Sequence, residues 1–97
     1  MYLSIRRYHV KLGAMAEITQ KVNQGFVPII SQVPGFVAYY LVDVGDDVGA
    51  TVSVFQDQAG AEESNRMAAD WVRQHIASLV ASVPEITAGE VTAYKIP

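Results

Sequence analysis

Residues 36–55 read FVAYYLVDVGDDVGATVSVF, and this stretch decides the fold. Residues 36–44 and 50–55 are rich in β-branched and aromatic residues, and most positions on both alternating faces are apolar. Such a pattern is typical of strands that are covered on both sides. Residues 45–49 have the composition of a turn, so we predict an antiparallel hairpin with a longer loop.

A strand and a helix precede this hairpin. Residues 2–10 alternate apolar and polar side chains, which indicates a strand. From residue 14 the apolar residues recur every three or four positions, as on one face of a helix: Met15, Ile18, Val22, Phe26 and Ile29. We expect Pro28 to kink or fray the last turn, because proline lacks a backbone donor, and Pro34-Gly35 to end the helix.

A second helix and a last strand follow the hairpin. Asp57 can cap this helix, and a stripe at helical spacing carries it to about residue 80: Ser64, Ala68, Trp71, Val72, His75, Ile76 and Leu79. Residues 86–96 have a strand pattern, with Gly89 a candidate bulge. The order strand, helix, strand, strand, helix, strand predicts a single α+β domain over residues 1–97. We expect a ferredoxin-like, four-stranded antiparallel sheet with both helices on one face.

The composition suggests that a second copy completes the core. The chain has 97 residues, of which 51% are hydrophobic and 18% charged. A domain of this size has little interior, so part of that apolar surface must be buried elsewhere. Because both helices cover the same sheet face, we expect the other face to pack against another copy in a homodimer.

Several classes of protein are disfavoured by the sequence. There is no cysteine, so neither a disulfide, a thiolate metal site nor a cysteine nucleophile can form. A net charge of −3 with scattered basic residues argues against nucleic acid as a partner, and no apolar run is long enough to span a membrane. The N-terminus lacks the pattern of a signal peptide, so we expect a cytoplasmic protein. No motif for a nucleotide cofactor or zinc is present, and Asp43, Asp46 and Asp47 fit a hairpin turn rather than a calcium loop.

Several short segments, taken with the predicted order of strands and helices, resemble those of a known protein family. They are residues 26–30 (FVPII), 34–36 (PGF) and 51–55 (TVSVF), with Asp57 and the acidic start of the second helix. Together with the element order they resemble the antibiotic biosynthesis monooxygenase-like family of dimeric α+β barrels. The resemblance implies a homodimer whose two sheets form a barrel, with a pocket in each subunit between sheet and helices. Members include cofactor-independent oxygenases of polyphenols and quinols, haem-degrading enzymes, isomerases of small metabolites and many proteins without known activity.

Trp71 and His75 form the most prominent candidate pair, because residues four apart share one helix face. His75 could act as a general base on a phenolic substrate, and the Trp71 indole could stack on an aromatic ring. The structural alternative is that Trp71 anchors the core and His75 makes one satisfied hydrogen bond.

Three further candidates are Tyr40, Arg7 and Asn65. Tyr40 could orient a substrate hydroxyl or could simply pack, and Arg7 could contact an anion or pair with a carboxylate of the chain. The haem-degrading relatives use an asparagine on the first strand and a wider tryptophan–histidine spacing, and both are missing here. The quinone-forming relatives use asparagine, tryptophan, tyrosine and arginine, and Asn65 with Trp71, Arg66 and Tyr40 supplies these residue types. Asn65 could equally belong to a solvated helix face.

These observations favour a cofactor-independent monooxygenase-like protein acting on a small aromatic or quinol. Two alternatives stay open: a non-enzymatic homodimeric module that binds a small ligand, and a small-metabolite isomerase.

Overall fold

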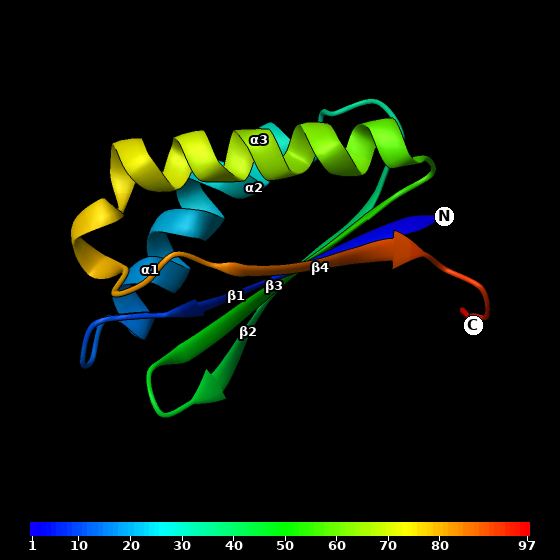
Figure 1. Cartoon of the computed structure of the whole chain (residues 1–97). Coiled ribbons are helices and arrows are strands. Elements are labelled where there is room, and N and C mark those ends of the chain that lie inside the picture. The colour runs from blue at the N-terminus through cyan, green and yellow to red at the C-terminus, as the bar shows by residue number, and fades with distance from the viewer.

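Four strands form one antiparallel sheet in the computed structural model, which describes all of residues 1–97. The strands are β1 (Tyr2–His9), β2 (Phe36–Gly45), β3 (Val48–Phe55) and β4 (Glu85–Glu90), arranged in the order β2-β3-β1-β4. All the helices lie on the same side of this sheet, as Figure 1 shows. The predicted ferredoxin-like α+β fold is therefore confirmed.

The first helical region is interrupted by a wider turn. It consists of α1 (Met15–Lys21), a π-helical turn (Val22–Phe26) and α2 (Val27–Ile30). The extra residue of the π turn moves the buried stripe by one position, so Ile30 is fully buried whereas the expected Ile29 is 47% exposed. Pro28 sits in the first turn of α2, where a missing donor costs little, so the irregularity precedes the proline instead of following from it.

The hairpin between β2 and β3 is tighter than predicted. Its central residues Asp46 and Asp47 have φ angles of 53° and 58°, and positive values at both positions are those of a two-residue hairpin turn. Asp47 also binds the neighbouring turn, because its backbone carbonyl accepts from the Val10 amide at 2.9 Å and its carboxylate from the Gly13 amide at 3.1 Å. The acidic turn thus fastens the hairpin to the end of β1.

The second helix is α3 (Gln58–His75), followed by a short 3₁₀ turn (Ala77–Leu79). Asp57 caps it as predicted, since its carboxylate accepts a hydrogen bond from the Gly60 amide at 2.9 Å. The α-helix ends at His75, before the predicted residue 80.

The last strand is shorter than the predicted range of 86–96. β4 ends at Glu90, and the Val91 amide donates to the Met1 carbonyl at 2.9 Å. Gly89 pairs in register with Leu3, so the bulge expected at Gly89 is absent. The sheet irregularities lie in β2 instead, between Phe36 and Ala38 and between Asp43 and Gly45.

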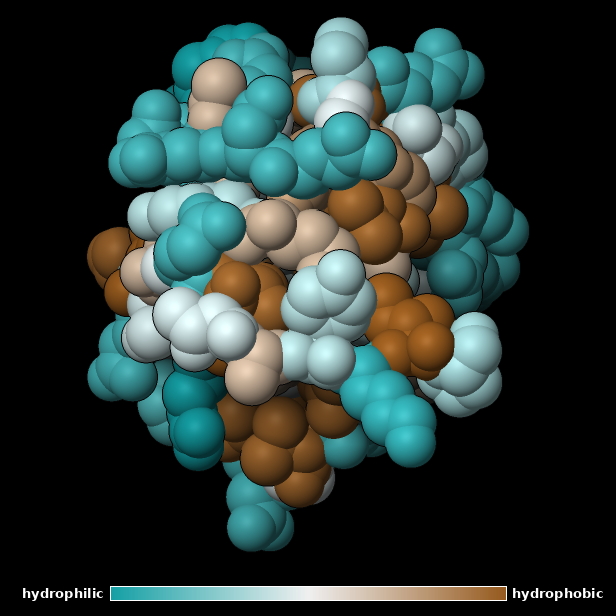
Figure 2. Space-filling model, turned by 90° about the vertical axis from the view of Figure 1, so that its right-hand side faces the viewer, coloured by the Kyte–Doolittle hydropathy of each residue, from teal (hydrophilic) through white to brown (hydrophobic).

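The core lies between the sheet and the helices. The helix-facing side chains of β1 are buried at Ser4, Arg6 and Tyr8, and the intervening residues are exposed at Ile5 and Arg7. In the view of Figure 2, hydrophilic atoms gather along the top, over α3, and hydrophobic patches interrupt the surface below it. None of the helices has the combination of length and hydropathy that crossing a bilayer requires.

We expect that alanine cannot replace Gly60, near the start of α3, without a loss of stability. A Cβ atom at this position would lie 2.7 Å from Cδ1 of the fully buried Phe55. Alanine normally stabilises a helix relative to glycine by roughly 0.5–1 kcal/mol, but overpacking a core costs about 1–3 kcal/mol. We therefore expect Gly60→Ala to lower the free energy of unfolding, measured by chemical denaturation. Gly89→Ala is the control, because no atom lies within 4 Å of its Cβ position; a Gly60→Ala variant at least as stable as the wild type would contradict this packing.

Candidate functional site

An apolar cavity of about 40 Å³ lies between the sheet and the helices. This is roughly three times the ~10–15 Å³ that one water molecule needs. Thirteen of its fifteen lining residues are hydrophobic, and they include Val10, Met15, Ile18, Val22, Phe26, Leu41, Ala68, Trp71, Val72, Ile76 and Val80. The cavity therefore suits an apolar group far better than a polar one.

Aromatic side chains form the wall around Trp71. The ring of Phe26 lies 5.5 Å from the Trp71 ring and 5.5 Å from the Tyr39 ring, centroid to centroid. Gly25 allows this packing, since a Cβ atom there would lie 3.2 Å from Cζ2 of Trp71. A flat aromatic ligand would meet π surfaces here, and such contacts contribute beyond their buried area.

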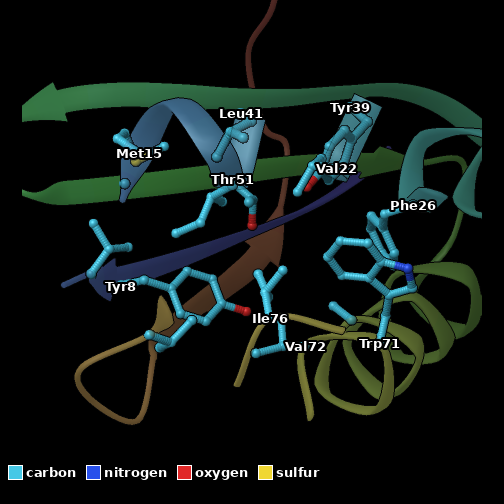
Figure 3. Close-up of a pocket in the computed structure, with 15 residues that line it drawn as sticks. Tyr8, Met15, Val22, Phe26, Tyr39, Leu41, Thr51, Trp71, Val72 and Ile76 are labelled. Atoms are coloured by element: carbon cyan, nitrogen blue, oxygen red, sulfur yellow. The ribbon is translucent and has the colours of Figure 1, made fainter. Parts of the chain in front are cut away.

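Hydroxyl groups supply the few polar contacts of the cavity. Tyr8, Tyr39 and Thr51 line it, and Figure 3 shows the hydroxyl oxygens of Tyr8 and Tyr39 directed towards its interior. The Tyr8 hydroxyl accepts a hydrogen bond from Nε of Arg6 at 2.9 Å. Because that bond uses an oxygen lone pair, the hydroxyl hydrogen of Tyr8 stays available to a ligand.

Tyr39 is kept in its neutral form. Burial raises the pKa of the Tyr39 phenol far above its ordinary value of 10.0, the nearby Tyr8 raises it further, and the positive charge of Arg6 offsets only part of this. At neutral pH Tyr39 is thus a hydrogen-bond donor and not a base.

The predicted pair Trp71 and His75 is only partly in the cavity. Trp71 is 7% exposed and lines it. The His75 ring lies 5.1 Å from the Trp71 ring, centroid to centroid, but His75 is exposed and is not a lining residue. Of the two, only Trp71 therefore lines the cavity, and His75 lies on the solvent side of the indole in the last turn of α3.

Tyr40 and Arg7 lie on the opposite face of the sheet. Tyr40 is 57% exposed there, and its neighbour Tyr39 lines the cavity. The bulge after Phe36 is the physical reason, because Phe36 packs on the helix side and the simple alternation that groups it with Tyr40 breaks at the next residue. Arg7 is likewise exposed, whereas Arg6 is buried beside Tyr8.

Asn65 lies beside the cavity and not in its lining. Its side-chain oxygen accepts a hydrogen bond from the Ser4 hydroxyl at 2.8 Å, and its backbone carbonyl accepts from Nη1 of Arg6 at 3.3 Å. Asn65 thereby joins α3 to two inward-facing residues of β1. The importance of Arg6, Tyr8 and Tyr39 was missed by the sequence reasoning, although the alternation of β1 already grouped Arg6 with Tyr8.

The shifted pKa of Tyr39 has a measurable consequence. In the unfolded chain this phenol ionises near its ordinary value of 10.0, whereas in the folded chain it stays protonated well above that pH. Stability should therefore fall as the pH rises beyond about 10, by up to ~1.4 kcal/mol per pH unit from this group. We expect Tyr39→Phe to flatten that slope in denaturant titrations and Tyr94→Phe, whose side chain is 70% exposed, to retain it. Identical slopes in the wild type and Tyr39→Phe would show that Tyr39 is not shielded.

Comparison with solved structures places this architecture among known folds. A protein of unknown function from Nitrosomonas europaea superposes with a TM-score of 0.82 at 23% identity, covering 99% of this chain and 93% of its own. Two proteins described as a "putative antibiotic biosynthesis monooxygenase" are also similar. The one from Nitrosomonas europaea has a TM-score of 0.76 at 14% identity, covering 96% of this chain and 100% of its own. The one from Bordetella bronchiseptica has a TM-score of 0.75 at 17% identity, covering 95% and 97%.

Neither a protein-family model nor a curated protein matches the sequence. The likeness is thus one of fold, and on that level it confirms the resemblance drawn from the sequence. The chain has the same ferredoxin-like α+β fold as three proteins described as a "putative antibiotic biosynthesis monooxygenase".

Proposed function

We propose that this chain is a cofactor-independent monooxygenase-like protein whose helix-side cavity binds a small aromatic molecule of the quinol or phenol type. The observation that carries this proposal is the pairing of an aromatic wall at Trp71 and Phe26 with two phenol donors, Tyr8 and Tyr39. The likeness to proteins described as monooxygenases adds support.

Ligand binding would use the two kinds of surface in the cavity. The ring of the ligand packs against Trp71 and Phe26, and its oxygen accepts hydrogen bonds from Tyr8 and Tyr39. Arg6 polarises Tyr8 through their hydrogen bond and places a positive charge behind it. This arrangement favours a ligand oxygen that becomes negative, because a charge-assisted hydrogen bond is stronger than a neutral one.

The reaction follows from an electron-rich substrate and dioxygen. The substrate loses the proton of its hydroxyl group, and the resulting anion gives an electron to dioxygen. The two radicals combine into a peroxide, which takes up a proton, and loss of water then leaves a carbonyl group. One hydroxyl group, one ring C–H group and one O₂ thus become two C=O groups and one H₂O. The protein stabilises the anion, positions the ring and limits the access of water.

The candidate base for the first step is His75. His75 was predicted for that role and lies beside Trp71, but on its solvent side. From there it would accept a proton only at the rim of the site. We therefore expect the loss of His75 to matter less than the loss of Tyr39.

Oxygen consumption with a panel of quinols and anthrones tests the enzymatic proposal. Tyr39→Phe removes one donor to the developing anion, so kcat/KM should fall about tenfold or more. The matched control is Tyr40→Phe, which removes the same group from the opposite face and should leave kcat/KM unchanged. His75→Ala should reduce the rate by less than Tyr39→Phe, and a larger reduction would restore His75 as the base.

The non-enzymatic alternative gives a different result in the same experiment. A module that only binds would quench the fluorescence of Trp71, the one tryptophan of the chain, without consuming oxygen. An isomerase using this cavity would convert a substrate at constant oxygen. Binding without oxygen uptake across the panel would overturn the monooxygenase proposal.

We further propose that two copies of the chain pair through the open face of the sheet. Tyr40, Val52 and Ile5 follow one another in register across three strands on this face. Tyr40 and Ile5 are exposed, and so is Val42 in the next row of β2. An uncovered apolar sheet face of this kind is typical of an interface, and a second sheet of the same shape would cover it.

A charge placed on the open face should separate the two copies. We expect Tyr40→Glu to sediment as a monomer at concentrations at which the wild type sediments as a dimer, because a buried unpaired carboxylate opposes association. Gln74→Glu, on an exposed position of α3, adds the same charge and should stay dimeric. A monomeric wild type at micromolar concentration would contradict the proposed interface.

A further inference from the structure

Arg6 is a buried guanidinium without a carboxylate partner. It is 4% exposed, and none of the ion pairs of the chain includes it. Its partners are neutral: Nε donates to the Tyr8 hydroxyl at 2.9 Å, and Nη1 donates to the Asn65 carbonyl at 3.3 Å. Arginine stays charged in proteins, and burying a charge without an opposite charge is costly. The positive charge of Arg6 is therefore not balanced by a carboxylate of this chain.

The free side of the guanidinium borders a groove. Arg6 makes two hydrogen bonds, and neither uses Nη2. No buried side-chain nitrogen or oxygen lacks a partner, so Nη2 is not sealed in the interior. Arg6 is instead a lining residue of an open groove of about 520 Å³ between α3 and the segment that leads into β4.

Basic and apolar side chains together line the groove. Arg66 and Arg73 line it together with Arg6, and no aspartate or glutamate does. Arg66 and Arg73 already pair with acidic residues of α3, so Arg6 holds the unbalanced charge. The apolar part of the lining consists of Ala69, Val72, Val80, Val83, Pro84 and Ile86.

We propose that this groove binds a small hydrophobic carboxylate, with its carboxyl group on Arg6 and its apolar part against Val72, Val80 and Ile86. The planar guanidinium matches the two oxygens of a carboxylate better than it matches a point charge. The apolar wall favours an organic anion over an inorganic one. Tyr8, Val72 and Val80 belong both to this groove and to the apolar cavity, so the two sites adjoin. The site is present whether or not the chain oxidises a substrate.

Calorimetric titration with sodium benzoate at neutral pH tests this site, with benzyl alcohol and inorganic phosphate as the comparison ligands. We expect benzoate to bind at least tenfold more tightly than either, because only benzoate satisfies both Arg6 and the apolar wall. Arg6→Lys keeps the charge but loses the two-oxygen geometry, and it should weaken benzoate binding about tenfold. Arg7→Lys, the same change on the opposite face of β1, should have no effect.

A measurement on the wild type covers the case in which Arg6 variants fail to fold. The Nε–H resonance of Arg6 should shift in an NMR titration with benzoate and stay in place with benzyl alcohol. Equal affinities for benzoate and benzyl alcohol, an unmoved Arg6 resonance, or equal weakening by Arg6→Lys and Arg7→Lys would each overturn the proposal. Phosphate binding as tight as benzoate would show that the groove is an inorganic anion site. None of these readouts depends on oxygen consumption, so their failure is distinct from failure of the monooxygenase proposal.

Discussion

The alternation of side chains along β1 is the constraint on which the rest of the structure depends. β1 lies between β3 and β4, and its position inside the sheet fixes which residues face the helices. Ser4, Arg6 and Tyr8 point inwards, and Ile5 and Arg7 point outwards. A slip of one residue would exchange these two sets, so the register of a single strand assigns a charge and a phenol to the interior.

The inward-facing residues of β1 border two neighbouring surfaces, the apolar cavity and the arginine-lined groove. Tyr8 stands between the apolar cavity and the arginine-lined groove, and Arg6 bonds to it from the groove side. Asn65 holds the same region from α3 by accepting bonds from Ser4 and Arg6. A ligand that carries both a ring and an acidic group would match the two surfaces together, which connects the proposed monooxygenase substrate with the proposed carboxylate site.

The fold could be predicted well from the sequence because apolar residues recur at helix or strand spacing over long, consistent stretches. The hairpin, the helical stripe through Trp71 and the Asp57 cap all follow from local rules. The side-chain positions predicted from the sequence were wrong where a single extra residue interrupts the period of a helix or strand. The π turn moves burial from Ile29 to Ile30, and the bulge after Phe36 exchanges Tyr40 for Tyr39. The groove was beyond sequence reasoning, because the segment after α3 that forms its wall has no periodic pattern.

A crystal structure grown with benzoate tests the central claim most directly, namely that the inward face of β1 forms the binding site. The account predicts the carboxylate within hydrogen-bonding distance of Nη2 of Arg6, with the ring against Val72 and Val80. A benzoate bound on the open sheet face beside Arg7, or an Arg6 paired with an acidic residue of the chain and no ligand beside it, would contradict the account.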